Sequence, residues 1–162
     1  MTEFVQRDKQ LSNEPYHYEE CGLDDVYLLN GFTVHKTPYG NGVSVSDADA
    51  LHKAIALHIC ADKPLISGKE FRFLRKLMDM TQAEMAILFG CDAQTVARWE
   101  KGESDIKGTI DRIIRILSLG YIKGAIDPLE VVTRISNIDD KTDIDMSFKV
   151  TQGGWKPTAC AH

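Results

Sequence analysis

The chain has 162 residues, of which 43% are hydrophobic and 27% are charged, and its formal net charge is −5. This composition is typical of a globular protein with a packed core and excludes a low-complexity chain. No apolar run approaches the roughly 18 residues that a membrane span needs, and no secretory signal opens the chain. We therefore expect a cytoplasmic protein without membrane contact, in which Cys21, Cys60, Cys91 and Cys160 are reduced, buried thiols.

The charge is unevenly distributed. Residues 1–67 carry five Lys/Arg against ten Asp/Glu, and residues 124–162 carry four against six. Residues 68–123 carry ten against eight, so the middle of the chain is mildly basic. This pattern is compatible with nucleic-acid binding through a few specific contacts, and it excludes binding through a positively charged surface over the whole protein.

Turn signals divide the N-terminal third into short segments. Residues 1–14 are polar and aperiodic, as is typical of a flexible arm. Short β-forming runs follow, and Asn30-Gly31 predicts a two-residue hairpin between two of them. Asp47 is a good N-cap for a helix with apolar residues at helical spacing. We expect a small β-meander closed by one helix, forming a β-rich partner-binding or dimerisation domain over residues 15–62.

The middle of the chain predicts four helices. Two capping boxes, S-x-x-E at 67–70 and T-x-x-E at 81–84, each precede a run with an apolar face. Gly90 and Gly102 are placed to end the second and third helices in the left-handed conformation. The run TIDRIIRILSLG at 109–120 repeats isoleucine and leucine at helical spacing and predicts the fourth helix.

The C-terminal part predicts one more helix and a strand. Asp127-Pro128 is an N-cap followed by proline at the first helical position, and it opens PLEVVTRISNI. Met146, Phe148 and Val150 alternate, which predicts a short strand ahead of Gly153. Over residues 127–162 the helix either packs on the helix before it or forms a dimer surface. The strand either crosses a dimer or folds back on the N-terminal meander. The fold class expected for the whole chain is α+β.

The stretch TQAEMAILFGCDAQTVARWEKGE, residues 81–103, contains the candidate functional residues. If Val96 and Trp99 anchor the third helix inward, Gln94 and Arg98 face outward. Glutamine suits an adenine edge and arginine a guanine edge or a phosphate, each base contact contributing ~1 to 3 kcal/mol of discrimination. At the start of the second helix, Gln82 lies beside free backbone N–H groups that suit a phosphate oxygen.

LRKLMDMTQAEMAILFGCDAQTVARWEKGE resembles the Cro/cI-type helix-turn-helix of the Xre family of bacterial and phage regulators. The matched pattern is L-R-x4-L-T-Q-x-E-L-A-x2-L-G-V-s-x2-T-V-s-x-W-E-x-G. Cys91 stands in place of its valine, and Met80, Met85 and Phe89 each stand in place of a leucine. The resemblance covers residues 68–118 and implies a five-helix DNA-binding domain, with its core over residues 67–124. The residues it implies for DNA contact are Thr81, Gln82, Asp92, Ala93, Gln94, Thr95, Arg98 and Lys101.

The order of a β-rich region followed by this motif also resembles MqsA-type antitoxins, though weakly. Those proteins often carry a zinc site built from two CxxC pairs, which this sequence lacks. His17, Cys21 and His35 do not supply a second ligand pair, so no metal or other cofactor is expected. No nucleophile triad, phosphate loop or paired-carboxylate signature indicates an enzyme.

These observations predict a homodimeric transcriptional repressor that binds double-stranded DNA at a palindromic operator. One alternative is the antitoxin of a type II toxin–antitoxin pair. It would neutralise a cognate toxin through its N-terminal region and regulate its own operon. Another is a helical module whose capping boxes and buried tryptophan serve folding alone.

Overall fold

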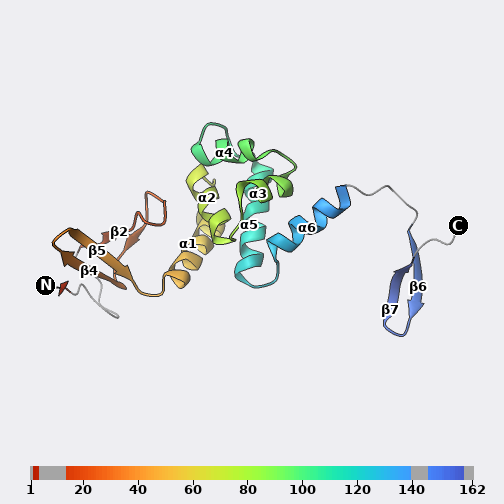
Figure 1. Cartoon of the computed structure of the whole chain (residues 1–162), viewed down its shortest axis with the longest axis horizontal. Coiled ribbons are helices and arrows are strands. Elements are labelled where there is room, and N and C mark those ends of the chain that lie inside the picture. Colours follow the sequence, from red (N-terminus) through yellow and green to blue (C-terminus); the bar gives the residue numbers. More distant parts are fainter. Residues whose placement is uncertain (1, 4–13, 140–145, 159–162) are drawn as a thin grey trace.

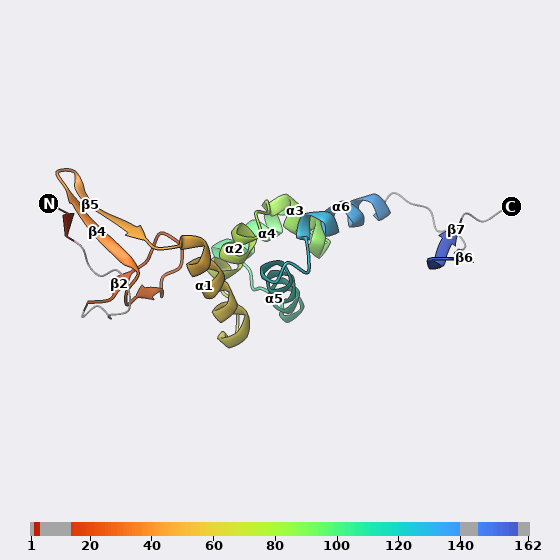
Figure 2. The same cartoon turned by 90° about the horizontal axis from the view of Figure 1, so that it is seen from below.

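The computed structural model describes residues 2–3, 14–139 and 146–158. These residues form six helices and three small antiparallel sheets, which confirms the α+β class. The molecule is elongated (Figure 1), with the N-terminal strands at one end, a C-terminal hairpin at the other and the helices between them. Figure 2 shows the same order from a second direction, with the helices in the middle.

Two small sheets take the place of the single predicted meander. Strand β2 (Tyr16–His17) pairs with β3 (Tyr27–Leu28). Strand β4 (Phe32–Thr37) pairs with β5 (Gly40–Val45) on one side and with β1 (Thr2–Glu3) on the other. Part of the predicted arm over residues 1–14 therefore joins a sheet, while residues 4–13 lie outside the described residues.

The hairpin predicted at Asn30-Gly31 is wrong. Gly31, with φ of +73°, leads from the first sheet to the second, and its carbonyl accepts a bond from the Ser46 N–H at 2.8 Å. The reversal between β4 and β5 occurs instead at Pro38-Tyr39, where the Thr37 hydroxyl donates to the Gly40 carbonyl at 2.6 Å. Proline supplies the φ that the first central position of a turn needs, so this second turn signal determines the pairing.

The helices of the capping boxes and of Gly90 and Gly102 begin and end where local chemistry predicts, whereas the helix after Lys107 begins without a side-chain cap. Both capping boxes are closed, with the Ser67 and Thr81 side chains accepting from the backbone three residues ahead. Gly90 and Gly102 adopt φ of +63° and +72° at the ends of their helices. The helices are α1 (Ala48–Asp62), α2 (Gly68–Leu77), α3 (Gln82–Phe89), α4 (Ala93–Lys101), α5 (Gly108–Ile122) and α6 (Pro128–Asp139).

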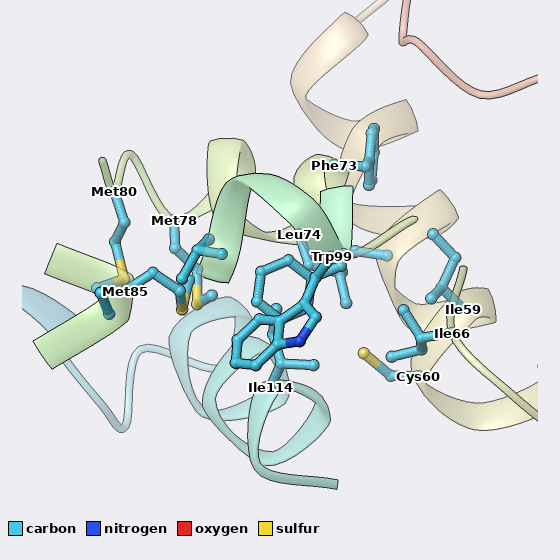
Figure 3. Close-up of a cluster of buried hydrophobic side chains, with 14 of the residues drawn as sticks. Ile59, Cys60, Ile66, Phe73, Leu74, Met78, Met80, Met85, Trp99 and Ile114 are labelled. Atoms are coloured by element: carbon cyan, nitrogen blue, oxygen red, sulfur yellow. The ribbon is translucent and has the colours of Figure 1, made fainter. Parts of the chain in front are cut away.

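The main core draws buried side chains from all six helices. Figure 3 shows the indole of Trp99 in the middle of this cluster, near Leu74 and Ile114. Trp99 also makes edge contacts with Phe71 and Phe89, at centroid distances of 5.7 and 6.0 Å. This packing confirms the inward position predicted for Trp99 and fixes the rotation of α4 about its axis.

The C-terminal elements differ in part from the prediction. Helix α6 packs mainly against α3, and its Val132 is only 7% exposed. The single predicted strand is a hairpin of β6 (Ser147–Thr151) and β7 (Gly154–Thr158). Gly154, with φ of +91°, starts β7, and Thr151 closes the turn by donating to the Gly154 carbonyl at 2.9 Å.

Three of the four cysteines lie in the described part, where Cys60 is buried and Cys21 and Cys91 are half-buried free thiols. Cys160 lies outside it. His17, Cys21 and His35 contact the Asp24 carbonyl, the Tyr18 carbonyl and the Ser44 hydroxyl respectively. None of the helices in the described ranges combines the length and apolarity that crossing a membrane requires.

Candidate nucleic-acid interface

Helices α3 and α4 are joined by only three residues. Gly90 ends α3 in the left-handed conformation, Cys91 is half-buried against the core, and Asp92 caps α4. The Asp92 carboxylate accepts the Thr95 N–H at 2.7 Å and the Thr95 hydroxyl at 2.8 Å. These two bonds hold the pKa of Asp92 below its ordinary value, so the cap stays ionised at neutral pH.

The outward face of α4 is polar and exposed. Val96 is fully buried on the inward side, while Gln94, Arg98 and Lys101 are exposed. Because these three residues are four and three positions apart, they lie on one helical face. Together with Ala97 and Glu103 they line a shallow depression of about 220 Å³. We name the surface formed by Gln94, Ala97, Arg98 and Lys101 the α4 face.

A buried ion pair anchors α4 to α2. The Arg75 guanidinium donates from Nε and Nη2 to the two Glu100 oxygens at 2.6 and 3.0 Å, and from Nη1 to the Met80 carbonyl at 2.8 Å. The Arg75 and Glu100 side chains are only 10% and 4% exposed. The paired, planar geometry fixes both helices, since each side chain is held at more than one atom.

Gln82, the residue expected to bind a phosphate, joins the same network. Its Nε2 donates to the Glu100 Oε2 at 2.9 Å, and the side chain is half-buried. An amide nitrogen carries two N–H groups, so this bond leaves one donor for another acceptor. The structure therefore places Gln82 at the edge of α3 in a fixed orientation, and its contact with DNA stays a prediction.

The remaining residues of the predicted site divide into two groups. The polar groups of Thr81, Asp92 and Thr95 are engaged in helix caps; Thr81 exchanges bonds with Glu84 through its N–H and its hydroxyl. Ala93 is half-buried at the start of α4. Arg98 and Lys101 form no salt bridge with any residue of the described ranges. The α4 face thus holds the side chains with free donors.

Two features of this region were not identified from the sequence. A Cβ on Gly68 would lie 2.1 Å from the Trp99 carbonyl oxygen and 2.8 Å from that of Glu100, so the start of α2 abuts the end of α4. Beside this close approach opens a cleft of about 600 Å³ that is partly lined by Lys69, Arg72 and Lys76. The K-x-x-R-x-x-x-K spacing was the available signal, because it places three cations on one side of a helix.

Comparison with protein-family models, curated proteins and solved structures finds no match for the chain. The functional assignment therefore rests on the residues and geometry of the chain itself.

Proposed function

We propose that the chain is a sequence-specific DNA-binding protein that acts as a homodimeric transcriptional repressor, with α3 and α4 as a helix-turn-helix. The observation that carries the proposal is the α4 face. It presents an amide and a guanidinium on a helix whose opposite side is locked into the core. A reading helix needs this combination, because base-edge contacts require planar polar groups held in a fixed register.

The spacing of Gln94 and Arg98 suits base pairs one or two steps apart. Gln94 and Arg98 are separated by about 6 Å along the helix axis at 1.5 Å per residue. Neighbouring base pairs lie ~3.4 Å apart along B-DNA, so the two side chains reach successive or next-but-one pairs. Gln94 would bind an adenine edge and Arg98 a guanine edge.

Phosphate contacts would set the orientation of α4 in the groove. Lys101 ends the exposed face and is available for a backbone phosphate. Gln82 offers its second amide N–H at the start of α3, and a helix N-terminus favours a phosphate oxygen. The acidic ends of the chain do not oppose this binding, because the excess of cations falls within residues 68–123.

The C-terminal hairpin offers a surface for the homodimer. Its register pairs Phe148 with Pro157 and Val150 with Trp155, so these four side chains share one face. Phe148, Val150 and Trp155 are 56%, 67% and 73% exposed. A two-stranded hairpin is at best marginally stable by itself in water. Contact with a second copy would cover this face and bring two α4 faces onto one operator.

Footprinting on the DNA upstream of the gene tests the proposal. We expect one protected site with two symmetric half-sites about one helical turn, ~34 Å, apart. A monomer would protect a single half-site, and a helical module without a DNA role would protect none. Either pattern would contradict the proposed homodimeric repressor.

A further inference from the structure

The cleft beside α2 has one strongly basic wall. Lys69, Arg72 and Lys76 follow one another at spacings of three and four residues, so they form a row along one side of the helix. All three are exposed. The row from Lys69 to Lys76 extends about 10 Å, since seven residues rise 1.5 Å each. Phosphates of one DNA strand follow one another every ~3.4 Å along the axis, so the row matches roughly three of them.

This wall is continuous with the α4 face. Lys101 lines both the cleft and the shallow depression that contains Gln94 and Arg98. The close approach of Gly68 to the Trp99 carbonyl fixes the start of α2 against the end of α4, so the two surfaces keep one relative position. A duplex held at the α4 face therefore has its backbone next to the basic wall.

Two of these cations have no partner in the described part of the chain. No salt bridge or side-chain hydrogen bond there involves Arg72 or Lys76. Glu100 also lines the cleft, but its charge is balanced by the buried guanidinium of Arg75. Exposed cations that stay unpaired at the rim of a cleft attract a polyanion. The regular spacing of these cations along α2 suits a polyanion with regularly spaced charges, such as a DNA strand.

The opposite wall is acidic and comes from the turn between β2 and β3. Glu20 and Asp24 line it, and the Asp24 carboxylate accepts from Lys69 Nζ at 2.6 and 2.8 Å. The two side chains of this pair are 57% and 76% exposed. An exposed ion pair of this kind contributes little to stability and is screened by salt. A dense row of phosphates can therefore replace the carboxylate on Lys69.

From these observations we propose that the cleft is a second DNA-binding site. Arg72, Lys76 and Lys69 bind backbone phosphates that flank the operator, and Asp24 competes with a phosphate for Lys69. The inference rests on the proposed function, and it adds a binding surface outside α3 and α4. Through Asp24 it also gives the acidic N-terminal region a direct influence on DNA affinity.

The test measures binding of an operator duplex and of an unrelated duplex over a range of salt concentrations. At 0.1 M salt, the Arg72→Gln/Lys76→Gln variant should bind both duplexes more weakly, by about tenfold for each phosphate that is no longer neutralised. The slope of log affinity against log salt should become shallower by about two. Asp24→Asn should act in the opposite direction and raise the affinity for both duplexes by up to about tenfold, because it frees Lys69.

The Lys53→Gln/Lys123→Gln variant is a matched control. It removes the same charge from exposed positions that line neither the cleft nor the α4 face. Its affinity and slope should equal those of the parent, and an equal loss in this control would overturn the proposal. Parental affinity and slope in the Arg72/Lys76 variant would overturn it too, while leaving the proposed function intact. If the parent chain bound neither duplex, both the proposed function and the proposed role of the cleft would be refuted.

Discussion

Replacing Glu100 with leucine removes one partner of the ion pair that fixes α4 to α2. Glu100 accepts two hydrogen bonds from Arg75 and one from Gln82. The variant leaves a guanidinium that is 10% exposed without its carboxylate. Removing one partner from such a buried pair destabilises a protein by about 3 to 5 kcal/mol. This is a large part of the ~5 to 15 kcal/mol that stabilises a typical domain.

The double variant Arg75→Met/Glu100→Leu separates the pair from the packing around it. Both charges are then absent, and the remaining losses are the Arg75 bond to the Met80 carbonyl and the Gln82 bond to Glu100. A net hydrogen bond contributes about 1 kcal/mol, so the double variant should lose only ~1 to 2 kcal/mol. The effects of the two single variants should therefore be strongly non-additive.

Urea unfolding followed by far-UV circular dichroism measures these free energies of unfolding. The exposed pair of Arg134 and Glu130 on α6, whose side chains are 74% and 57% exposed, is the control. Its matched substitutions, Arg134→Met and Glu130→Leu, should change the free energy of unfolding by no more than about 0.5 kcal/mol. A loss of less than roughly 1 kcal/mol of unfolding free energy in Glu100→Leu, or a loss in the double variant equal to the sum of the single variants, would contradict a buried, coupled ion pair.

Two further changes probe other parts of the structure. Gly68→Ala should destabilise the chain by roughly 1 to 3 kcal/mol because the added Cβ meets the Trp99 carbonyl at 2.1 Å. Gly108→Ala, with nothing within 4 Å of its Cβ, should be neutral or stabilising in the same unfolding assay, and equal losses would contradict this. A hydrogen bond to Glu20 is the main cause that raises the pKa of Tyr16 to about 12. Because the pKa of Tyr16 is higher in the folded than in the unfolded chain, its bond to Glu20 stabilises the fold fully below pH ~10. This contribution to the free energy of unfolding is lost as the pH rises through 12. Burial also raises the pKa of Tyr18, but only the Tyr16 phenol should move from about 12 towards pH 10 in an absorbance titration of Glu20→Gln, and an unchanged curve would exclude the bond.

The sequence predicts the helices well because their signals are local. A capping box needs two residues three positions apart, and a left-handed cap needs one glycine, as at Gly90 and Gly102. Strand pairing depends on distant residues, and here two turn signals lie within ten residues of each other. The sequence alone did not show that Pro38-Tyr39 would form the hairpin while Gly31 would join two sheets.

Some features of the candidate site follow from local sequence, and others depend on the packing of distant residues. The outward position of Gln94 and Arg98 follows from the spacing of Val96 and Trp99, which one helix determines. The bond from Gln82 to Glu100 joins residues 18 positions apart, and only the packing of the helices brings them together. The basic cleft also needs tertiary structure, since its acidic wall lies 45 positions from Lys69.

The most direct test of the account is the specificity of Arg98→Ala and Lys101→Ala, measured as affinities for the operator and for an unrelated duplex. If the α4 face reads bases, Arg98→Ala should lose ~1 to 3 kcal/mol on the operator, and its preference for the operator should fall accordingly. Lys101→Ala should weaken both duplexes about equally and reduce the salt slope by roughly one. If both variants bound the operator as the parent does, α4 would not be the reading helix.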